Sequence, residues 1–172
     1  MSDLQVLARK KVEAQMHRII SALPDRIEAV KRELSAKGLT RSGATLKRTS
    51  NICLAAMKEQ SITIITEYCW AAEHALFASQ TWIEQLIVDA IESIQPLLQG
   101  CESHLRNAAE FTGTPELKDR LLGDLNDAYQ MVTEDITLAL HSSFAERRRG
   151  LIKVIPGFVQ RLLGRLFTGG TI

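Results

Sequence analysis

No glycine or proline interrupts the chain between Ala44 and Gln95. A single helix over this stretch would be about 75 Å long at 1.5 Å per residue, which is too long for a compact domain. Residues 81–84 (Thr-Trp-Ile-Glu) match a capping box, in which the Thr hydroxyl and the Glu carboxylate satisfy backbone donors at a helix start. The sequence therefore predicts one helix over about 43–79 and another over about 82–99.

The residues before this stretch are also helical in pattern. Apolar side chains recur from Leu4 to Leu34, mostly at four-residue steps, and so mark one helix face. Pro24 either kinks one long helix or occupies the first turn of a second. Gly38 is typical of a helix stop.

The residues after this stretch predict two more helices. A short one covers 101–111, and Thr114 followed by Pro115 is typical of a cap and first turn. An apolar stripe then runs from Leu117 to Phe144, and it is long enough to suggest self-association. The β-branched run at 61–66 disfavours a helix locally, but the flanking periodicity overrides it.

These patterns predict an all-α fold, an antiparallel up-and-down bundle of four to five long amphipathic helices. Ten Gly and four Pro in 172 residues allow only short, few loops, and aromatic residues make up only 5%. A β-sandwich or barrel would need far more turn residues. The alternative is an elongated coiled-coil-like hairpin that dimerises. We divide the chain into a bundle, residues 1–146, and a C-terminal segment, residues 147–172.

The sequence predicts a cytoplasmic protein. The first residues lack the cationic and apolar regions of a signal peptide, and carboxylates interrupt the best candidate for a membrane span, residues 61–99. Cys53, Cys69 and Cys101 are widely spaced and odd in number, so we interpret them as reduced, buried thiols.

Charge is distributed unevenly along a chain whose net charge is +1. Residues 1–50 carry a net charge of +6, residues 51–146 of −11, and residues 147–172 of +6. The simpler interpretation is that basic and acidic helices lie side by side in one bundle. The functional alternative is that a basic end binds an anionic partner.

The residue patterns of known catalytic and metal sites are missing from the sequence. None of the four histidines follows a Glu at the three-residue spacing of di-iron bundles, and Glu13 with His17 is a single weak pair. No nucleophile elbow or phosphate-binding glycine loop occurs. We expect no catalytic residues, no metal and no cofactor. The aromatic residues of the middle region are expected to pack in the core: Tyr68, Trp70, Phe77 and Trp82.

The C-terminal segment is the most unusual part of the sequence. At helical spacing, its apolar residues form a broad arc with cationic residues beside it, a pattern typical of a helix that docks in a groove or at a membrane surface. The alternative is a helix that closes the bundle against its acidic middle. The predicted contact residues for a partner or a membrane are Arg147, Arg148, Arg149, Lys153, Phe158, Arg161, Leu162, Arg165 and Leu166.

The leading functional hypothesis is a non-enzymatic helical interaction protein, a scaffold, adaptor or regulator that works through protein–protein contacts, among them those of a homo-oligomer. The first alternative is association with an anionic membrane surface through residues 147–172, which would place the protein at a membrane periphery. Nucleic-acid binding is less favoured, because the basic N-terminal third lacks aromatic residues. An enzyme with a site of scattered residues is a further alternative.

Overall fold

The computed structural model describes residues 3–75 and 79–148, and these form a helical bundle. Helices account for 91% of the described residues, and none of them lies in a strand. The predicted all-α bundle is therefore confirmed. The helices are α1 (Asp3–Ser35), α2 (Gly43–His74), α3 (Gln80–Glu92), α4 (Gln95–Thr112) and α5 (Pro115–Arg148).

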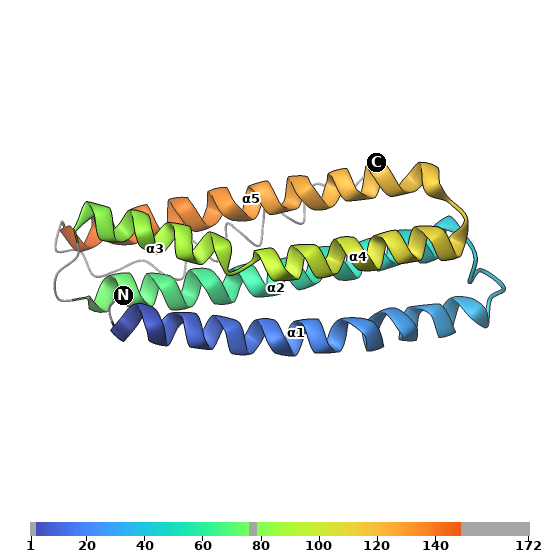
Figure 1. The fold of residues 1–172 in the computed structure, drawn as a ribbon, viewed down its shortest axis with the longest axis horizontal. Coiled ribbons are helices and arrows are strands. Elements are labelled where there is room, and N and C mark those ends of the chain that lie inside the picture. Colours follow the sequence, from blue (N-terminus) through green and yellow to red (C-terminus); the bar gives the residue numbers. More distant parts are fainter. Residues whose placement is uncertain (1–2, 76–78, 149–172) are drawn as a thin grey trace.

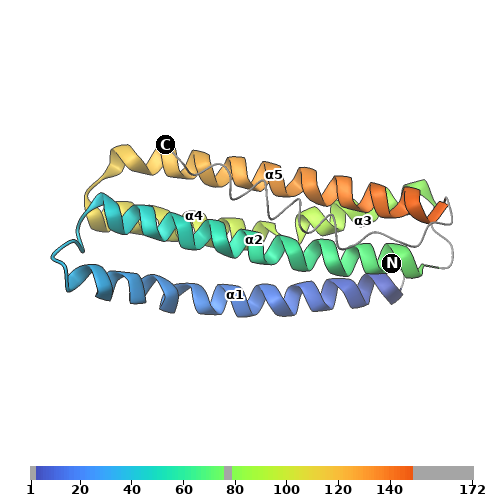
Figure 2. The same cartoon turned by 180° about the vertical axis from the view of Figure 1, so that it is seen from behind.

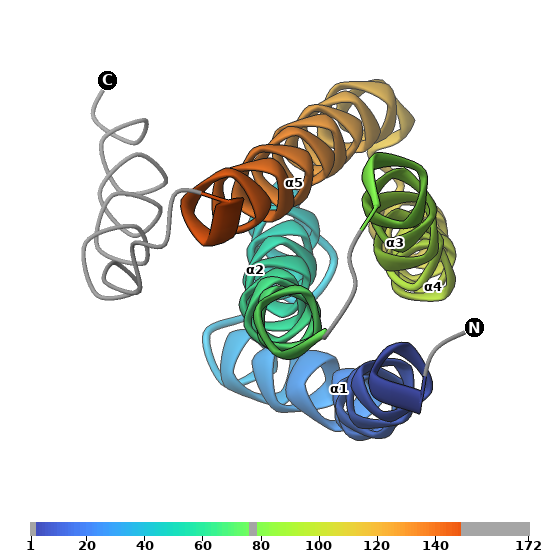
Figure 3. The ribbon, with the colours of Figure 1, turned by 90° about the vertical axis from the view of Figure 1, so that its left-hand side faces the viewer.

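The five helices form four rods, because α3 and α4 follow one another along the same line (Figures 1 and 2). Each rod runs antiparallel to the one before it in the chain. The 33 residues of α1 make a rod of about 50 Å, so the bundle is elongated. Seen from one end, α2 lies between α1 and α5, and α2 and α5 run in the same direction (Figures 1 and 3).

The second helix is the central one, since it packs against all four others. Its buried residues come in adjacent pairs, such as Thr49 with Ser50, Ala56 with Met57, and Ala71 with Ala72. Adjacent residues point about 100° apart on a helix, so these pairs give α2 a broad buried surface. The buried residues of α1 instead follow steps of three, four or more and cover one narrower face.

The structure decides between the two interpretations of Pro24. This residue lies inside the single helix α1, on its exposed side. The predicted stop at Gly38 is confirmed. Gly38 adopts the left-handed conformation (φ 69°) just after the helix, and the Leu39 amide donates to the Leu34 carbonyl at 2.8 Å. Such a turn satisfies carbonyls that the helix end leaves without partners.

The predicted capping box was wrong about which residue caps α3. The cap is Ser79, whose hydroxyl accepts a hydrogen bond from the Trp82 amide at 3.1 Å. The helix therefore begins at Gln80, and α2 ends at His74 rather than near residue 79. The Ser79 hydroxyl can cap the amide three residues on, and the Thr81 hydroxyl could do the same for a helix that began two residues later. The local pattern alone therefore could not decide between them.

The break between α3 and α4 also differs from the prediction. It lies at Ser93 and Ile94, whereas Gly100, the expected boundary, sits inside α4. Pro96 explains the position of the break. A proline in the helix interior loses a hydrogen bond and clashes with the preceding turn, but it is tolerated in the first turn, where Pro96 lies.

The last helix follows the predicted pattern. Gly113 ends α4 with φ 68°, Thr114 precedes the helix, and Pro115 is its first residue. Within the Leu117–Phe144 stripe, Leu125 and Ile136 are fully buried. Because α2, α3 and α4 cover this stripe, it gives no argument for self-association, which stays a prediction.

The cap of α3 generates a testable prediction. The substitution Ser79→Ala removes the hydroxyl that accepts a hydrogen bond from the Trp82 amide. We expect the free energy of unfolding to fall by about 1 kcal/mol. The matched control is Thr81→Ala, at the residue that the sequence wrongly favoured, with a change of less than about 0.5 kcal/mol. Urea denaturation of both variants measures the difference, and a larger loss for Thr81→Ala would contradict the assignment.

Candidate functional site

A buried carboxylate joins three helices near one end of the bundle. Asp89 on α3 is 9% exposed. Its Oδ2 atom accepts hydrogen bonds from the Tyr68 hydroxyl on α2 at 2.9 Å and from Gln5 Nε2 on α1 at 3.2 Å. Its Oδ1 atom accepts from Arg9 Nη1 on α1 at 2.9 Å. We call these four residues the Asp89 cluster.

The surroundings of the cluster explain how it holds a charge inside the bundle. Tyr68 is fully buried and Gln5 is 6% exposed, so both donors are out of water. Arg9 lies at the rim and also donates to Glu13 at 2.9 Å. The hydrogen bond to Glu13, and next the charge of Asp89, raise the pKa of Arg9. A buried carboxylate needs this kind of hydrogen-bonded cationic partner, because an unpaired buried charge is costly.

The geometry suits a structural link better than a reacting group. Three donors converge on the two oxygens of Asp89, so the carboxylate is already occupied. Burial, and next the hydrogen bond to Asp89, raise the pKa of the Tyr68 phenol, which therefore keeps its proton as a donor. The cluster ties α1 to α3, two helices whose backbones make few close approaches.

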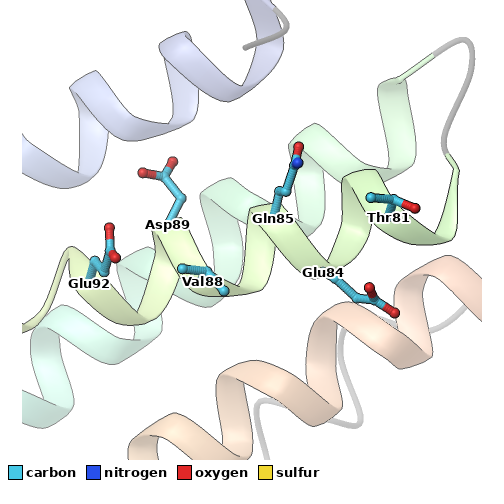
Figure 4. A pocket seen from close by; sticks show the side chains of 6 residues that line it. All are labelled: Thr81, Glu84, Gln85, Val88, Asp89 and Glu92. Carbon is cyan, nitrogen blue, oxygen red and sulfur yellow. The ribbon is translucent and has the colours of Figure 1, made fainter.

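An open hollow lies on the solvent side of this cluster, along α3 (Figure 4). It measures about 330 Å³, and Asp89 forms part of its wall. Gln85 and Asp89 point to the side of α1, whereas Glu84 points to the side of α5 (Figure 4). Val88 is 55% exposed although it is apolar. The remaining lining residues are Thr81 and Glu92.

Ion pairs between helices show how the uneven charge of the sequence is arranged. Lys11 of α1 bonds to Glu67 of α2 at 2.7 Å, and Arg26 of α1 lies 3.4 Å from Glu59 of α2. Basic α1 thus lies against the acidic half of α2, as in the simpler interpretation of the charge pattern. These pairs are partly exposed, so each contributes little to stability.

Only two of the nine predicted contact residues fall in the described part of the chain. Arg147 and Arg148 belong to the last turn of α5, and Arg147 Nη1 donates to the Ala72 carbonyl of α2 at 3.1 Å. The other seven lie outside the described residues: Arg149, Lys153, Phe158, Arg161, Leu162, Arg165 and Leu166.

The three cysteines are free thiols. Cys53 and Cys101 are fully buried and face each other between α2 and α4, where each Sγ lies within 4 Å of the other residue's carbonyl oxygen. Cys69 is only partly buried, which the sequence did not predict. Burial, and next the charge of Glu73, raise the pKa of Cys69 to about 12, so this thiol stays protonated near neutral pH.

The aromatic residues of the middle region pack as expected where they are described. Tyr68 is fully buried, and Trp70 and Trp82 pack against the core. Phe77 lies outside the described residues. Trp70 also stacks on His74, with ring centroids 5.0 Å apart, and Lys11 Nζ lies 5.1 Å from the Trp70 ring centroid.

Sequence reasoning missed the Asp89 cluster. One signal could have pointed to it, because Asp89 stands among the core positions Ile83, Leu86 and Ala90 of an otherwise apolar helix face. Nothing in the sequence separates Arg9 from its basic neighbours Lys10 and Lys11. The partners of Asp89 come from residues more than 20 positions away in the chain, so their convergence needs the tertiary structure.

Comparison with known proteins adds no relative, since no family model, no curated protein and no solved structure matches this chain. Within residues 3–75 and 79–148, no group of three or more His, Cys, Asp and Glu side chains is placed to hold a metal ion. No helix among these residues is both long enough and apolar enough to cross a bilayer.

Removing the carboxylate tests the structural role of the Asp89 cluster. In Asp89→Ala the Tyr68 hydroxyl and the Gln5 amide are left buried without their acceptor, and we expect a loss of about 2–3 kcal/mol in unfolding free energy. The control is Glu92→Ala, an exposed carboxylate on the same helix, with a change within about 0.5 kcal/mol. Equal urea midpoints for the two variants would contradict the role.

The raised pKa of Tyr68 predicts a loss of stability at high pH. The unfolded chain releases the phenol proton near pH 10, whereas the folded chain holds it, so this contribution is complete below about pH 10 and declines above it. Tyr68→Phe should therefore lose less stability than the original chain between about pH 9 and pH 11. Urea midpoints at both pH values measure this, and parallel declines would contradict it.

Proposed function

We propose that this protein is a non-enzymatic helical interaction protein, a scaffold, adaptor or regulator, and that one of its contact surfaces is the outer side of α3. We call this surface the α3 contact face. It consists of the exposed residues around the hollow: Thr81, Glu84, Gln85, Val88 and Glu92.

The exposure of Val88 is the observation that carries the proposal. Three neighbouring large apolar residues of α3 are buried, with Ile83 and Leu86 fully so and Ile87 at 7% exposure. Val88 is 55% exposed and forms a wall of the hollow. A single exposed apolar residue is common on protein surfaces. Here it lies in a concave place beside polar groups, which suits an inserted side chain of a partner.

The charges of the face indicate what kind of partner fits. Glu84 and Glu92 are exposed, and neither forms an ion pair with a described cation. A partner protein with a Lys or Arg next to an apolar side chain would place its cation on these carboxylates and its apolar group on Val88. Complementary charges of this kind guide association and fix the orientation of the partner.

The rigid framework behind the face supports the same proposal. The Asp89 cluster holds α3 to α1 and α2 through three hydrogen bonds directly beneath the face. A surface that is already ordered loses little conformational freedom on binding. The membrane-surface alternative depends on residues 147–172, most of which lie outside the described part of the chain.

Site-specific crosslinking in the native host tests the α3 contact face. A photoreactive amino acid placed at Val88 should give a discrete crosslinked product with another protein. The matched control is the same amino acid at Leu39, which is 44% exposed and lies in the loop between α1 and α2. Adding Glu84→Arg and Glu92→Arg should abolish the product because the cationic partner is then repelled. The same product from Leu39, or none from Val88, would refute the α3 contact face.

A further inference from the structure

A second surface that combines apolar and acidic residues lies on the outer side of α5. Its four residues follow one another at steps of four, three and four, which places them along one helix face: Asp127, Met131, Glu134 and Leu138. Met131 is 43% exposed and Leu138 is 56% exposed. Asp127, which precedes Met131, and Glu134, which lies between the two apolar residues, are exposed carboxylates. We call these four residues the α5 outer stripe.

The carboxylates of the stripe are available to a cationic partner. Neither Asp127 nor Glu134 forms an ion pair with a cation of residues 3–75 and 79–148. The core side of α5 is already covered by the rest of the bundle. The stripe is therefore a separate surface that presents two apolar contacts and two negative charges at fixed positions.

The sequence beyond α5 has the complementary composition. Residues 149–172 contain four Lys or Arg and no Asp or Glu. Their apolar residues recur at helical spacing, with Phe158, Leu162 and Leu166 four residues apart. This segment begins where α5 ends, so it is tethered to the helix that carries the stripe. Tethering replaces a bimolecular encounter with a high effective concentration.

We propose that residues 149–172 dock along the α5 outer stripe, antiparallel to α5. Pro156 fits the first turn of a helix, and the 17 residues from 156 to 172 in helical form would span about 26 Å. The stripe from Leu138 back to Asp127 rises only about 17 Å, so this part of the segment is long enough. In an antiparallel register that brings Leu162 beside Leu138, Leu166 lies at the level of Glu134, between Leu138 and Met131. Arg165 then lies near Glu134. This inference is independent of the α3 contact face and its partner.

Docking on the α5 outer stripe would fix which cation of residues 149–172 meets which carboxylate, whereas binding to an anionic membrane would not. A lipid surface requires an apolar helix face with positive charge beside it, but it pairs no particular cation with a particular carboxylate. The stripe instead sets two apolar contacts seven residues apart with one carboxylate, Glu134, between them. The pairing thus specifies which cation meets which carboxylate, and single charge reversals can test it.

Intramolecular crosslinking of the full chain tests the docking. Leu138→Cys is combined with Leu162→Cys in a Cys69→Ser background, since Cys53 and Cys101 are fully buried. A short bismaleimide should join the two new thiols within one chain, as mass spectrometry of the linked peptides would show. The matched control pairs Leu162→Cys with Leu7→Cys on α1, at a side chain that is 43% exposed, and should give no such product.

Charge reversal separates specific docking from chance proximity. Glu134→Arg should cause loss of most of the crosslink between positions 138 and 162, and Arg165→Glu added to it should restore the crosslink. Circular dichroism checks that each variant keeps its helix content. Equal crosslinking at positions 7 and 138, no crosslink at either, or no response to charge reversal would overturn the proposal.

Vesicle binding distinguishes the membrane alternative. The intact chain is sedimented with phosphatidylcholine vesicles with and without phosphatidylserine, at low and high salt. If the segment is docked, the Glu134→Arg variant should bind the anionic vesicles more strongly than the intact chain does. Strong, salt-sensitive binding by the intact chain that Glu134→Arg leaves unchanged would mean that the segment is not held on α5, and would overturn the proposal.

Discussion

The bundle depends on the burial of α2 among all the other helices. A helix with neighbours on several sides must fill a broad surface with side chains that fit, and α2 does so with small and medium residues such as Ala56, Ala71 and Cys53. Small side chains allow close approach of helix backbones, and tight packing of this kind carries most of the stability of a helical domain. Polar contacts then link α2 to its neighbours, as where Gln60 Nε2 donates to the Val12 carbonyl of α1.

The Asp89 cluster acts where this packing is weakest. The first helix packs mainly on α2 and makes few close backbone approaches to α3. The hydrogen bonds from Arg9 and Gln5 to Asp89 therefore link α1 to α3 directly. A buried carboxylate adds little net stability once desolvation is counted, but it allows only the arrangement in which its donors converge. Directional bonds thus set the position of α3, which carries both the hollow and Val88.

Charge has two roles in this molecule. Between neighbouring helices, partly exposed cations of α1 lie against carboxylates of α2 and α3, as with Lys11 and Glu67. On the outer faces of α3 and α5, carboxylates such as Glu92 and Glu134 remain exposed beside apolar side chains. The acidic middle of the sequence therefore exceeds what the basic N-terminal helix neutralises. We infer that the excess serves partners of positive charge, whether another protein or the C-terminal segment of the same chain.

The sequence by itself determined the helical class, a bundle of four to five helices, the helix stop at Gly38 and the helix start at Pro115. It could do so because backbone conformation and apolar periodicity act over a few neighbouring residues. It did not determine whether Ser79 or Thr81 caps α3, since both offer a hydroxyl at a suitable spacing. The candidate site shows the same limit: Asp89 could be marked as a charge on an apolar face, but Tyr68, Gln5 and Arg9 could not be assigned to it. Only the tertiary structure decided that α2 and α5 lie side by side and that these four residues meet. Such contacts join positions far apart in the chain, and their energies depend on how whole helix surfaces pack, which no local pattern records.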